Sequence, residues 1–273
     1  MEKSLFEILS VFSFLMGTCV ASFLNVVIWR VPRGESIVRP PSHCPKCQAE
    51  IRWYQNIPIL SWLFLRGRCA SCKAPISPRY ILVETLGGVL FLLAFWRFGL
   101  VAPLAWIWLS LMIAGSFIDF DLQLLPDFVT VGGMVLGVAL AVASALSGWP
   151  LAFCPGQGWE PLAWSLAGLV FGFGLLWLVR FFGSKAFGRE AMGLGDVFLM
   201  GAVGALFGPV AVLVTLIVSS FVGAAVGLAM LLVSKAKLGG FTPIPFGPYI
   251  CFGCLVWMYR GPEFVSWYIG LFR

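Results

Sequence analysis

The chain has 273 residues, of which 60% are hydrophobic and 11% are charged, and it carries a net charge of +6. Its mean hydropathy of +0.96 excludes a soluble globular domain and indicates a protein that crosses a membrane several times. The positive charge does not indicate a nucleic-acid partner, because the basic residues cluster between apolar segments, as they do in membrane proteins.

The first apolar segment, residues 5–29, can cross a membrane as one helix, since about 20 residues span the apolar core. It has no basic n-region and no small-residue cleavage site, so we expect a retained helix rather than a removed signal. Arg30 and Arg33 follow it and place this end in the cytoplasm by the positive-inside rule. Near the same end, Asn25 either hydrogen-bonds a neighbouring helix or belongs to a site.

Residues 30–79 form a polar segment that contains two C-x2-C pairs, Cys44 with Cys47 and Cys69 with Cys72. Two such pairs at this spacing are typical of a structural four-thiolate zinc site. A disulfide is disfavoured in a reducing cytoplasm, and cysteines used as small residues would not explain the doubled spacing. A segment this short needs the metal to fold. The apolar stretch between the pairs is too short to span, and we expect it to lie on membrane lipids.

Seven more helices are predicted downstream, at residues 80–98, 104–118, 128–147, 161–179, two within 197–234, and 249–259. Glu84, one turn into the second helix, either pairs with Arg79 or faces a site. Residues 239–248 are rich in Pro and Gly and predict a re-entrant or interfacial loop. Cys251 and Cys254 are interpreted as small packing residues inside the last helix.

The predicted fold is therefore an all-α polytopic membrane protein. It has about eight transmembrane helices, a small zinc-binding cytoplasmic segment between helices 1 and 2, and both termini outside the cytoplasm. We expect three parts: a first helix at residues 1–29, the zinc segment at 30–79, and a seven-helix membrane domain at 80–273.

Carboxylates at membrane depth are the strongest functional signal. Asp119, Asp121 and Asp127 end the third span and Asp196 opens a later apolar run, although an aspartate at mid-bilayer costs about 2.5–3.5 kcal/mol. The predicted topology brings Asp196 and the earlier group to one membrane face. Two neighbouring carboxyls share one proton, so that one acts as general base on water and the other as general acid on an amide carbonyl.

The residues alone do not decide between Asp119 and Asp121, which point to different sides of a helix. Asp196 and Asp127 could also cap helices, and Pro126 fits a turn. Gly193 and Gly195 allow a sharp backbone turn and a close approach by a substrate strand or a neighbouring helix.

Several motifs resemble those of the type IV prepilin peptidases, and they occur in the family's order along nearly the whole chain. These motifs are SFLNVVIWRVP at 22–32, the two cysteine pairs, NIPILSWLFLRGRC at 56–69, ISPRYILVE at 76–84, IDFDLQLLPD at 118–127, GLGD at 193–196 and PFGP at 245–248.

The resemblance implies a bifunctional enzyme of the bacterial inner membrane with its active site at the cytoplasmic face. Such an enzyme cleaves the basic leader of type IV prepilins and pseudopilins after a Gly, and then methylates the new N-terminal residue, usually Phe, with S-adenosylmethionine. The family pattern assigns the catalytic aspartates to Asp119 and Asp196. Pilus or type II secretion assembly components are further expected partners. Since no glycine-rich nucleotide loop is present, we expect S-adenosylmethionine on residues 30–79 or at their junction with the membrane, near Asn25, Glu84 and the zinc site.

A basic leader needs acidic groups near the aspartate pair, and the candidates are Asp121, Asp127, Glu84 and Glu190. Two other classes of function compete with the peptidase. An ion- or proton-coupled transporter would use Asp119 and Asp196 near the membrane midplane and contain inverted repeats. A non-catalytic zinc-ribbon scaffold would leave GLGD and PFGP unexplained.

Overall fold

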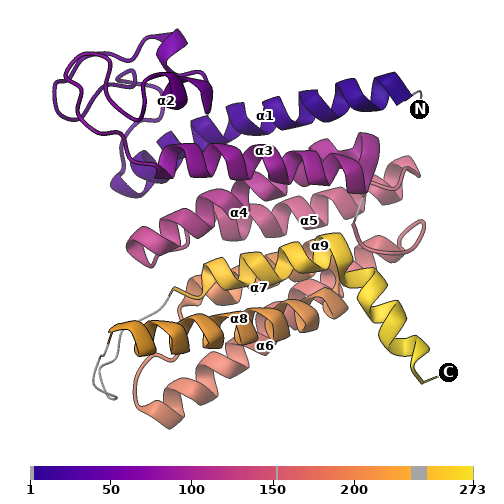
Figure 1. Ribbon diagram of the computed structural model, residues 1–273. Coiled ribbons are helices and arrows are strands. Elements are labelled where there is room, and N and C mark those ends of the chain that lie inside the picture. Colours follow the sequence, from indigo (N-terminus) through magenta and orange to yellow (C-terminus); the bar gives the residue numbers. More distant parts are fainter. Residues whose placement is uncertain (1–2, 152, 235–244, 273) are drawn as a thin grey trace. The chain divides into compact units, whose positions relative to one another are not determined.

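A computed structural model of the chain describes residues 3–151, 153–234 and 245–272, and every long regular element in these ranges is an α-helix (Figure 1). The helices are α1 (Lys3–Arg30), α2 (Leu60–Phe64), α3 (Arg79–Phe98), α4 (Ala102–Leu122), α5 (Asp127–Ser147), α6 (Glu160–Phe187), α7 (Leu194–Phe207), α8 (Pro209–Ser234) and α9 (Gly247–Gly270). Three short 3-10 helices, η1 (Val31–Arg33), η2 (Trp53–Gln55) and η3 (Gly99–Val101), complete the order. The prediction of an all-α fold is confirmed.

Five segments of the described residues are long and apolar enough to cross a membrane: Lys3–Arg33, Arg79–Leu122, Asp127–Ser147, Glu160–Phe187 and Pro209–Met230. The second of these contains both α3 and α4, and α7 is a shorter apolar helix of 14 residues. A multi-pass membrane protein is therefore confirmed, and helices occur at all eight predicted places. The count of eight crossings stays a prediction.

The chain folds into two compact units, Met1–Ala114 and Gly115–Arg273, and the boundary falls inside α4. In the first unit α1 and α3 pack side by side along their length (Figure 1). The polar segment between them contains only η1, η2 and the five-residue α2, in agreement with the expectation that it does not span. The proposed division at residues 29 and 79 remains a prediction.

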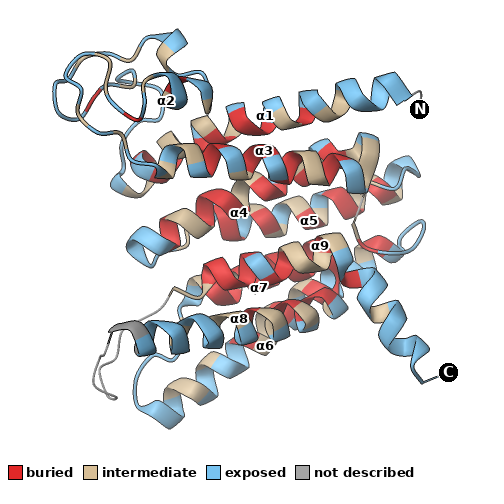
Figure 2. Cartoon of the chain, viewed as in Figure 1, coloured by how far each residue is buried: buried red, intermediate tan, exposed pale blue. Residues whose placement is uncertain are grey.

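The second unit is built around α7, which packs against α5 and α6, while α8 packs against α9. Every residue from Asp196 to Phe207 except Phe198 is buried. The first part of α9 is mostly buried, and its last turns are exposed (Figure 2). Gly168 of α6 and Gly204 of α7 face each other so closely that a Cβ on either would collide with the other's backbone. Small residues drive helix association in membranes, because lipid competes with every larger apolar side chain.

Three helices extend beyond their predicted ends. α4 continues past Asp119 to Leu122, α6 continues to Phe187, and α9 continues to Gly270 despite Pro262. Most of the loop predicted at 239–248 lies outside the described residues. Its last two residues, Gly247 and Pro248, already belong to α9, because proline is well tolerated in the first turn of a helix.

Candidate functional site

Asp119 lies in the last turn of α4 and is buried, with 5% of its surface exposed. The helix ends just beyond it, where Gln123 takes a positive φ of 53° and donates its backbone N–H to the Asp119 carbonyl. Asp121, two residues further, is exposed. The helical spacing thus directs Asp119 inward and Asp121 outward, which separates the two candidates that the residues alone left open.

Asp196 lies in the first turn of α7 and is also buried, at 8% exposure. Gly193, and not Asp196, is the residue before the helix, so Asp196 does not take the capping position considered as an alternative for it. The carboxyl turns back toward Gly193, where a Cβ would stand 3.4 Å from Asp196 Oδ2. A carboxylate in the first turn is favoured by the helix dipole, which compensates part of the cost of burial.

The two carboxyls lie inside the second unit, near enough for the charge of Asp119 to act on Asp196. Asp119 Oδ2 accepts a hydrogen bond of 3.0 Å from the backbone N–H of Gly247, the first residue of α9. A Cβ at Gly247 would stand 2.7 Å from that oxygen and 3.2 Å from Leu125 Cδ1. Leu125 also packs against Gly195, whose Cβ would stand 2.8 Å from Leu125 Cβ. Gly195 and Gly247 therefore let α7 and α9 close around the pair.

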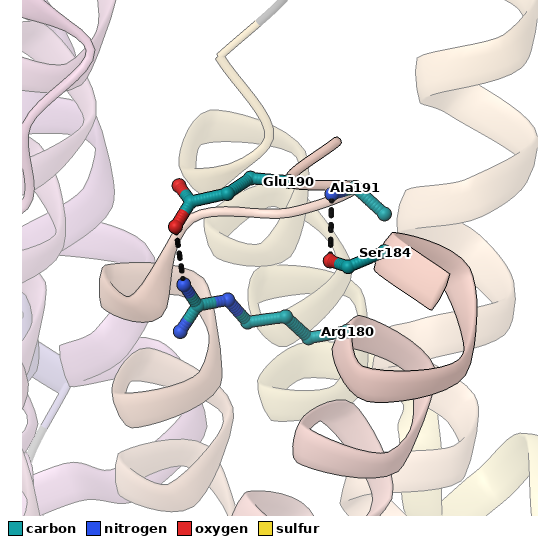
Figure 3. Close-up of polar contacts among 4 residues, drawn as sticks. All are labelled: Arg180, Ser184, Glu190 and Ala191. Atoms are coloured by element: carbon teal, nitrogen blue, oxygen red, sulfur yellow. Dashed lines mark hydrogen bonds and ion pairs between the residues drawn. The ribbon is translucent and has the colours of Figure 1, made fainter. Parts of the chain in front are cut away.

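The loop that leads into α7 is fastened to the end of α6. Arg180 Nη2 pairs with Glu190 Oε1 at 2.9 Å, and the backbone N–H of Ala191 donates to Ser184 Oγ at 3.0 Å (Figure 3). These contacts set the entry of the chain into Gly193 and so contribute to the position of Asp196. Because Glu190 is engaged with Arg180, it is a weaker candidate for attracting a basic peptide than the sequence indicated.

Two residues make contacts near the pair that the sequence did not predict. Cys251 is buried, in agreement with its interpretation as a packing residue, and it also lies within electrostatic reach of both aspartates and hydrogen-bonds Ser116 of α4. Gly247 was noted only as part of the PFGP motif, and its contact with Asp119 joins residues 128 apart in the chain. No local pattern could have predicted that contact, although a Pro-flanked Gly is a signal of close backbone approach.

The other predicted positions lie around these two. Asp127 opens α5 and is exposed, while Pro126 precedes that helix in an extended conformation. In the first unit, Asn25 Nδ2 donates to the Tyr80 carbonyl at 3.4 Å. Glu84 Oε2 accepts the backbone N–H of Ile59 at 2.7 Å, and Glu84 is buried. Ile59 has an unusual φ of +63°, so Glu84 fixes a strained residue of the polar segment to α3.

The four cysteines of the polar segment form one cluster. Their Sγ atoms all lie within 4.8 Å of one another, with Cys44 to Cys72 at 3.8 Å and Cys47 to Cys69 at 4.0 Å. A tetrahedral zinc with Zn–S bonds of about 2.3 Å separates its sulfurs by roughly 3.8 Å. The donor set and its geometry therefore fit a structural metal site. His43 bonds the Pro41 carbonyl through Nδ1 and is not part of this cluster.

The two cysteine pairs have the same backbone conformation. Cys44 and Cys69 donate their N–H groups to Ala49 and Ala74, and the residues before these alanines both have a φ of +59°. Backbone N–H groups of the following residues, Cys47 and Lys46, lower the pKa of Cys44 to about 6. The N–H groups of Cys72 and Ser71 lower the pKa of Cys69 in the same way. The first cysteine of each pair therefore favours the thiolate form that a metal requires. The Ala49 N–H lowers the pKa of Cys47, but the neighbouring thiols and burial outweigh it, and the pKa of Cys47 is raised to about 11.

Two family models match the chain. "Bacterial Peptidase A24 N-terminal domain" matches residues 15–98, and "Type IV leader peptidase family" matches residues 106–228. No solved structure matches.

Several curated relatives are named "Prepilin leader peptidase/N-methyltransferase". The relative from Myxococcus xanthus (strain DK1622) is 45% identical over 82% of this chain and 63% of its own length. The relative from Neisseria gonorrhoeae is 37% identical over 84% of each chain. The relative from Pseudomonas putida is 34% identical over 91% of this chain and 90% of its own.

Proposed function

Because this chain belongs to the type IV leader peptidase family, we propose that it removes the leader of type IV prepilins or pseudopilins and then methylates the new N-terminal amine. One observation carries the proposal: two buried carboxyls, Asp119 and Asp196, lie together at the ends of two apolar helices. A buried carboxyl pair is costly, and it is the arrangement that aspartic peptidases use.

The reaction follows from a pair that shares one proton. The ionised carboxyl takes a proton from water, whose oxygen attacks the carbonyl carbon of the Gly before the cleavage point, while the protonated carboxyl gives its proton to the carbonyl oxygen. The tetrahedral intermediate then loses the amine, which takes up a proton as the C–N bond breaks. Because the two groups titrate as a pair, we assign the roles of base and acid to the pair and not to single residues.

Neighbouring residues support the pair. The Gly247 N–H orients Asp119, and Gly195 lets Leu125 pack closely against the start of α7. Gly193, which is exposed, leaves the backbone before Asp196 open to an extended substrate. Pro126 fixes the turn between α4 and α5. Asp121 and Asp127 are exposed next to this turn and attract the basic leader.

Methylation uses S-adenosylmethionine as the donor. The amine lone pair forms the new N–C bond, the C–S electron pair returns to sulfur, and the extra proton of the amine leaves to water. We assign zinc to Cys44, Cys47, Cys69 and Cys72 as a structural metal that holds residues 30–79 in shape.

The enzyme is placed in the bacterial inner membrane, with lipids, prepilins and pilus or type II secretion components as partners. Both termini are periplasmic and the aspartate pair lies at the cytoplasmic face. This orientation rests on the basic residues that follow α1 and on those of residues 180–189. The transporter and scaffold alternatives are not favoured, since both leave the names of the relatives unexplained.

Mass spectrometry of one peptide tests the proposal. The purified protein is incubated with a prepilin peptide and S-adenosylmethionine, and we expect loss of the leader followed by a gain of one methyl group at the new N-terminus. A matched peptide in which the Gly before the cleavage point is replaced by Val is the control and stays intact. If the folded protein leaves the Gly peptide uncut, the proposed function is wrong.

A further inference from the structure

A groove of about 380 Å³ runs along the C-terminal half of α1 in the first unit. One wall is the face of α1 and the other is formed by residues 37–42 with 56 and 58. Its lining residues are Cys19, Ser22, Phe23, Val26, Arg30, Ile37, Val38, Pro40, Pro41, Ser42, Asn56 and Pro58. The volume lies in the range of small-molecule sites, and the lining is mostly apolar with a few polar groups, as such sites are.

Arg30 is the unusual member of this lining, because it is a buried cation without a counter-charge. It is 8% exposed and donates only to neutral carbonyls, from Nη1 to Ser36 at 2.9 Å and from Nη2 to Pro40 at 2.8 Å. No carboxylate pairs with it among the residues that the structure describes. A buried charge is normally paired, since leaving water costs several kcal/mol. The remaining guanidinium donors therefore suit an anion, and a carboxylate matches their planar fork.

The rest of the lining suits a nucleoside. Phe23 presents a half-exposed aromatic ring, which can stack against a purine. The side chains of Ser22, Ser42 and Asn56 have no hydrogen-bond partner within the described ranges, so their hydroxyls and amide can serve ribose hydroxyls. An adenine, a ribose and a carboxylate are the three recognisable parts of S-adenosylmethionine.

A second cavity, of about 400 Å³, offers a useful contrast. It lies in the other unit and is lined by Trp177, Arg180, Phe181, Ser184, Lys185 and Glu190. There Arg180 already has a carboxylate partner in Glu190. The residues of this second cavity fall within the peptidase match at 106–228, whereas all residues of the α1 groove fall within the separate N-terminal match at 15–98. The α1 groove therefore contains Arg30, a cation without a carboxylate partner among the described residues, and lies outside the peptidase match. Both features suit a site for methyl transfer.

We propose that the α1 groove binds the methyl donor, with Arg30 on the donor's carboxylate, Phe23 against its adenine, and Asn56 among the groups on its ribose. The proposal rests on the methyltransferase half of the proposed function. It replaces the expectation that Asn25 and Glu84 bind the donor. Neither residue lines the groove, and both are used in contacts with Tyr80 and Ile59.

Binding of S-adenosylhomocysteine tests the proposal without turnover. This analogue is the donor without its methyl group, so it keeps the adenine, ribose and carboxylate but cannot transfer a methyl group. Full-length protein in phosphatidylcholine nanodiscs is titrated calorimetrically. We expect Arg30→Gln to weaken binding about tenfold or more, the loss of a charge-assisted contact, and Phe23→Ala to weaken it several-fold. The matched controls Arg33→Gln and Trp29→Ala, exposed and outside the groove, stay within twofold.

The same preparations are assayed for leader cleavage, which separates the two proposals. If the wild type cleaves the leader but does not bind the analogue, the groove is not the donor site, while the proposed peptidase activity still holds. Equal binding by all four variants also overturns it. A fifth variant, Trp177→Ala, changes the second cavity, and weakening of analogue binding by this variant alone overturns the α1 groove as well. Arg30→Gln also removes the hydrogen bond that holds the loop at Ser36, so a loss of binding in this variant alone can come from a displaced loop. The proposal therefore requires that Phe23→Ala weakens binding as well.

A repeat in nanodiscs that contain phosphatidylglycerol tests whether the groove binds a lipid phosphate instead. If Arg30→Gln retains less phosphatidylglycerol than wild type but binds the analogue equally well, the groove binds lipid and the proposal is wrong.

Discussion

The cysteine cluster and the aspartate pair are two sites that the chain builds in opposite ways. The cluster lies on a segment with little regular structure, where two short turns of identical conformation each present two sulfurs. The aspartate pair lies in a packed bundle, where α4, α7 and α9 each contribute one part. The first geometry is encoded locally, and we expect it to need a metal to persist. The second is encoded by the packing of helices distant in sequence and needs only that packing.

The largest effect is expected from breaking the bundle that holds the aspartate pair. Gly168→Leu drives a side chain into the backbone of α7 at Gly204, and we expect a loss of about 3 kcal/mol or more in the free energy of unfolding. Thermal unfolding in detergent measures it. Gly174→Leu is the matched control on the same helix, because nothing lies within 4 Å of a Cβ there. Equal melting temperatures for the two variants would contradict the close packing of α6 and α7.

Removing the metal should disrupt the other region alone. Cys72→Ser removes one of the four ligands, and chelation removes the metal itself. Metal binding contributes about 10 kcal/mol to folding in small zinc domains. We expect amide hydrogens of residues 44–74 to exchange rapidly while those of α7 stay protected, as followed by hydrogen-exchange mass spectrometry. Ser71→Ala, one residue away and exposed, should leave both regions unchanged. Protection of residues 44–74 without metal would show that the segment folds on its own.

A smaller change tests how the helix bundle positions its carboxyls. Gly247→Ala places a Cβ 2.7 Å from Asp119 Oδ2, so the carboxyl must shift while the fold persists. We expect kcat for leader cleavage to fall about 10- to 100-fold with little change in KM, because small misplacements of reacting groups are costly. Gly132→Ala in α5, where a Cβ meets nothing within 4 Å, is the control. A normal kcat would mean that the Gly247 contact is not needed.

The smallest effects are expected from surface charge. Asp121→Lys should raise KM for a basic leader peptide a few-fold at low salt and less at high salt, since exposed charges are screened. Glu190→Lys should raise it less, because Glu190 already pairs with Arg180. Steady-state kinetics at two ionic strengths measure both. Equal KM values for wild type and Asp121→Lys would exclude Asp121 from recognition of the leader.

The contrast between the regions also explains what the sequence could predict. The spacing of Cys44, Cys47, Cys69 and Cys72 predicted the cluster, because each pair defines its own turn. Apolar runs predicted the helices to within a few residues, except where α4, α6 and α9 extend past the expected ends. Proximity of Asp119 and Asp196 followed only from counting membrane crossings. The Gly247 N–H on Asp119 and the uncompensated charge of Arg30 depend on packing that no local pattern specifies.

Cleavage by paired aspartate variants is the most direct measurement of the proposed chemistry. One prepilin peptide is followed under single-turnover conditions with wild type, Asp119→Asn, Asp196→Asn, the double variant and the exposed control Asp121→Asn. We expect Asp119→Asn and Asp196→Asn each to lose about a thousandfold in rate, the double variant to lose no more than either, and Asp121→Asn to keep most of its activity. Near-normal cleavage by either single variant of the pair, or losses that multiply in the double variant, would contradict a shared-proton aspartate pair.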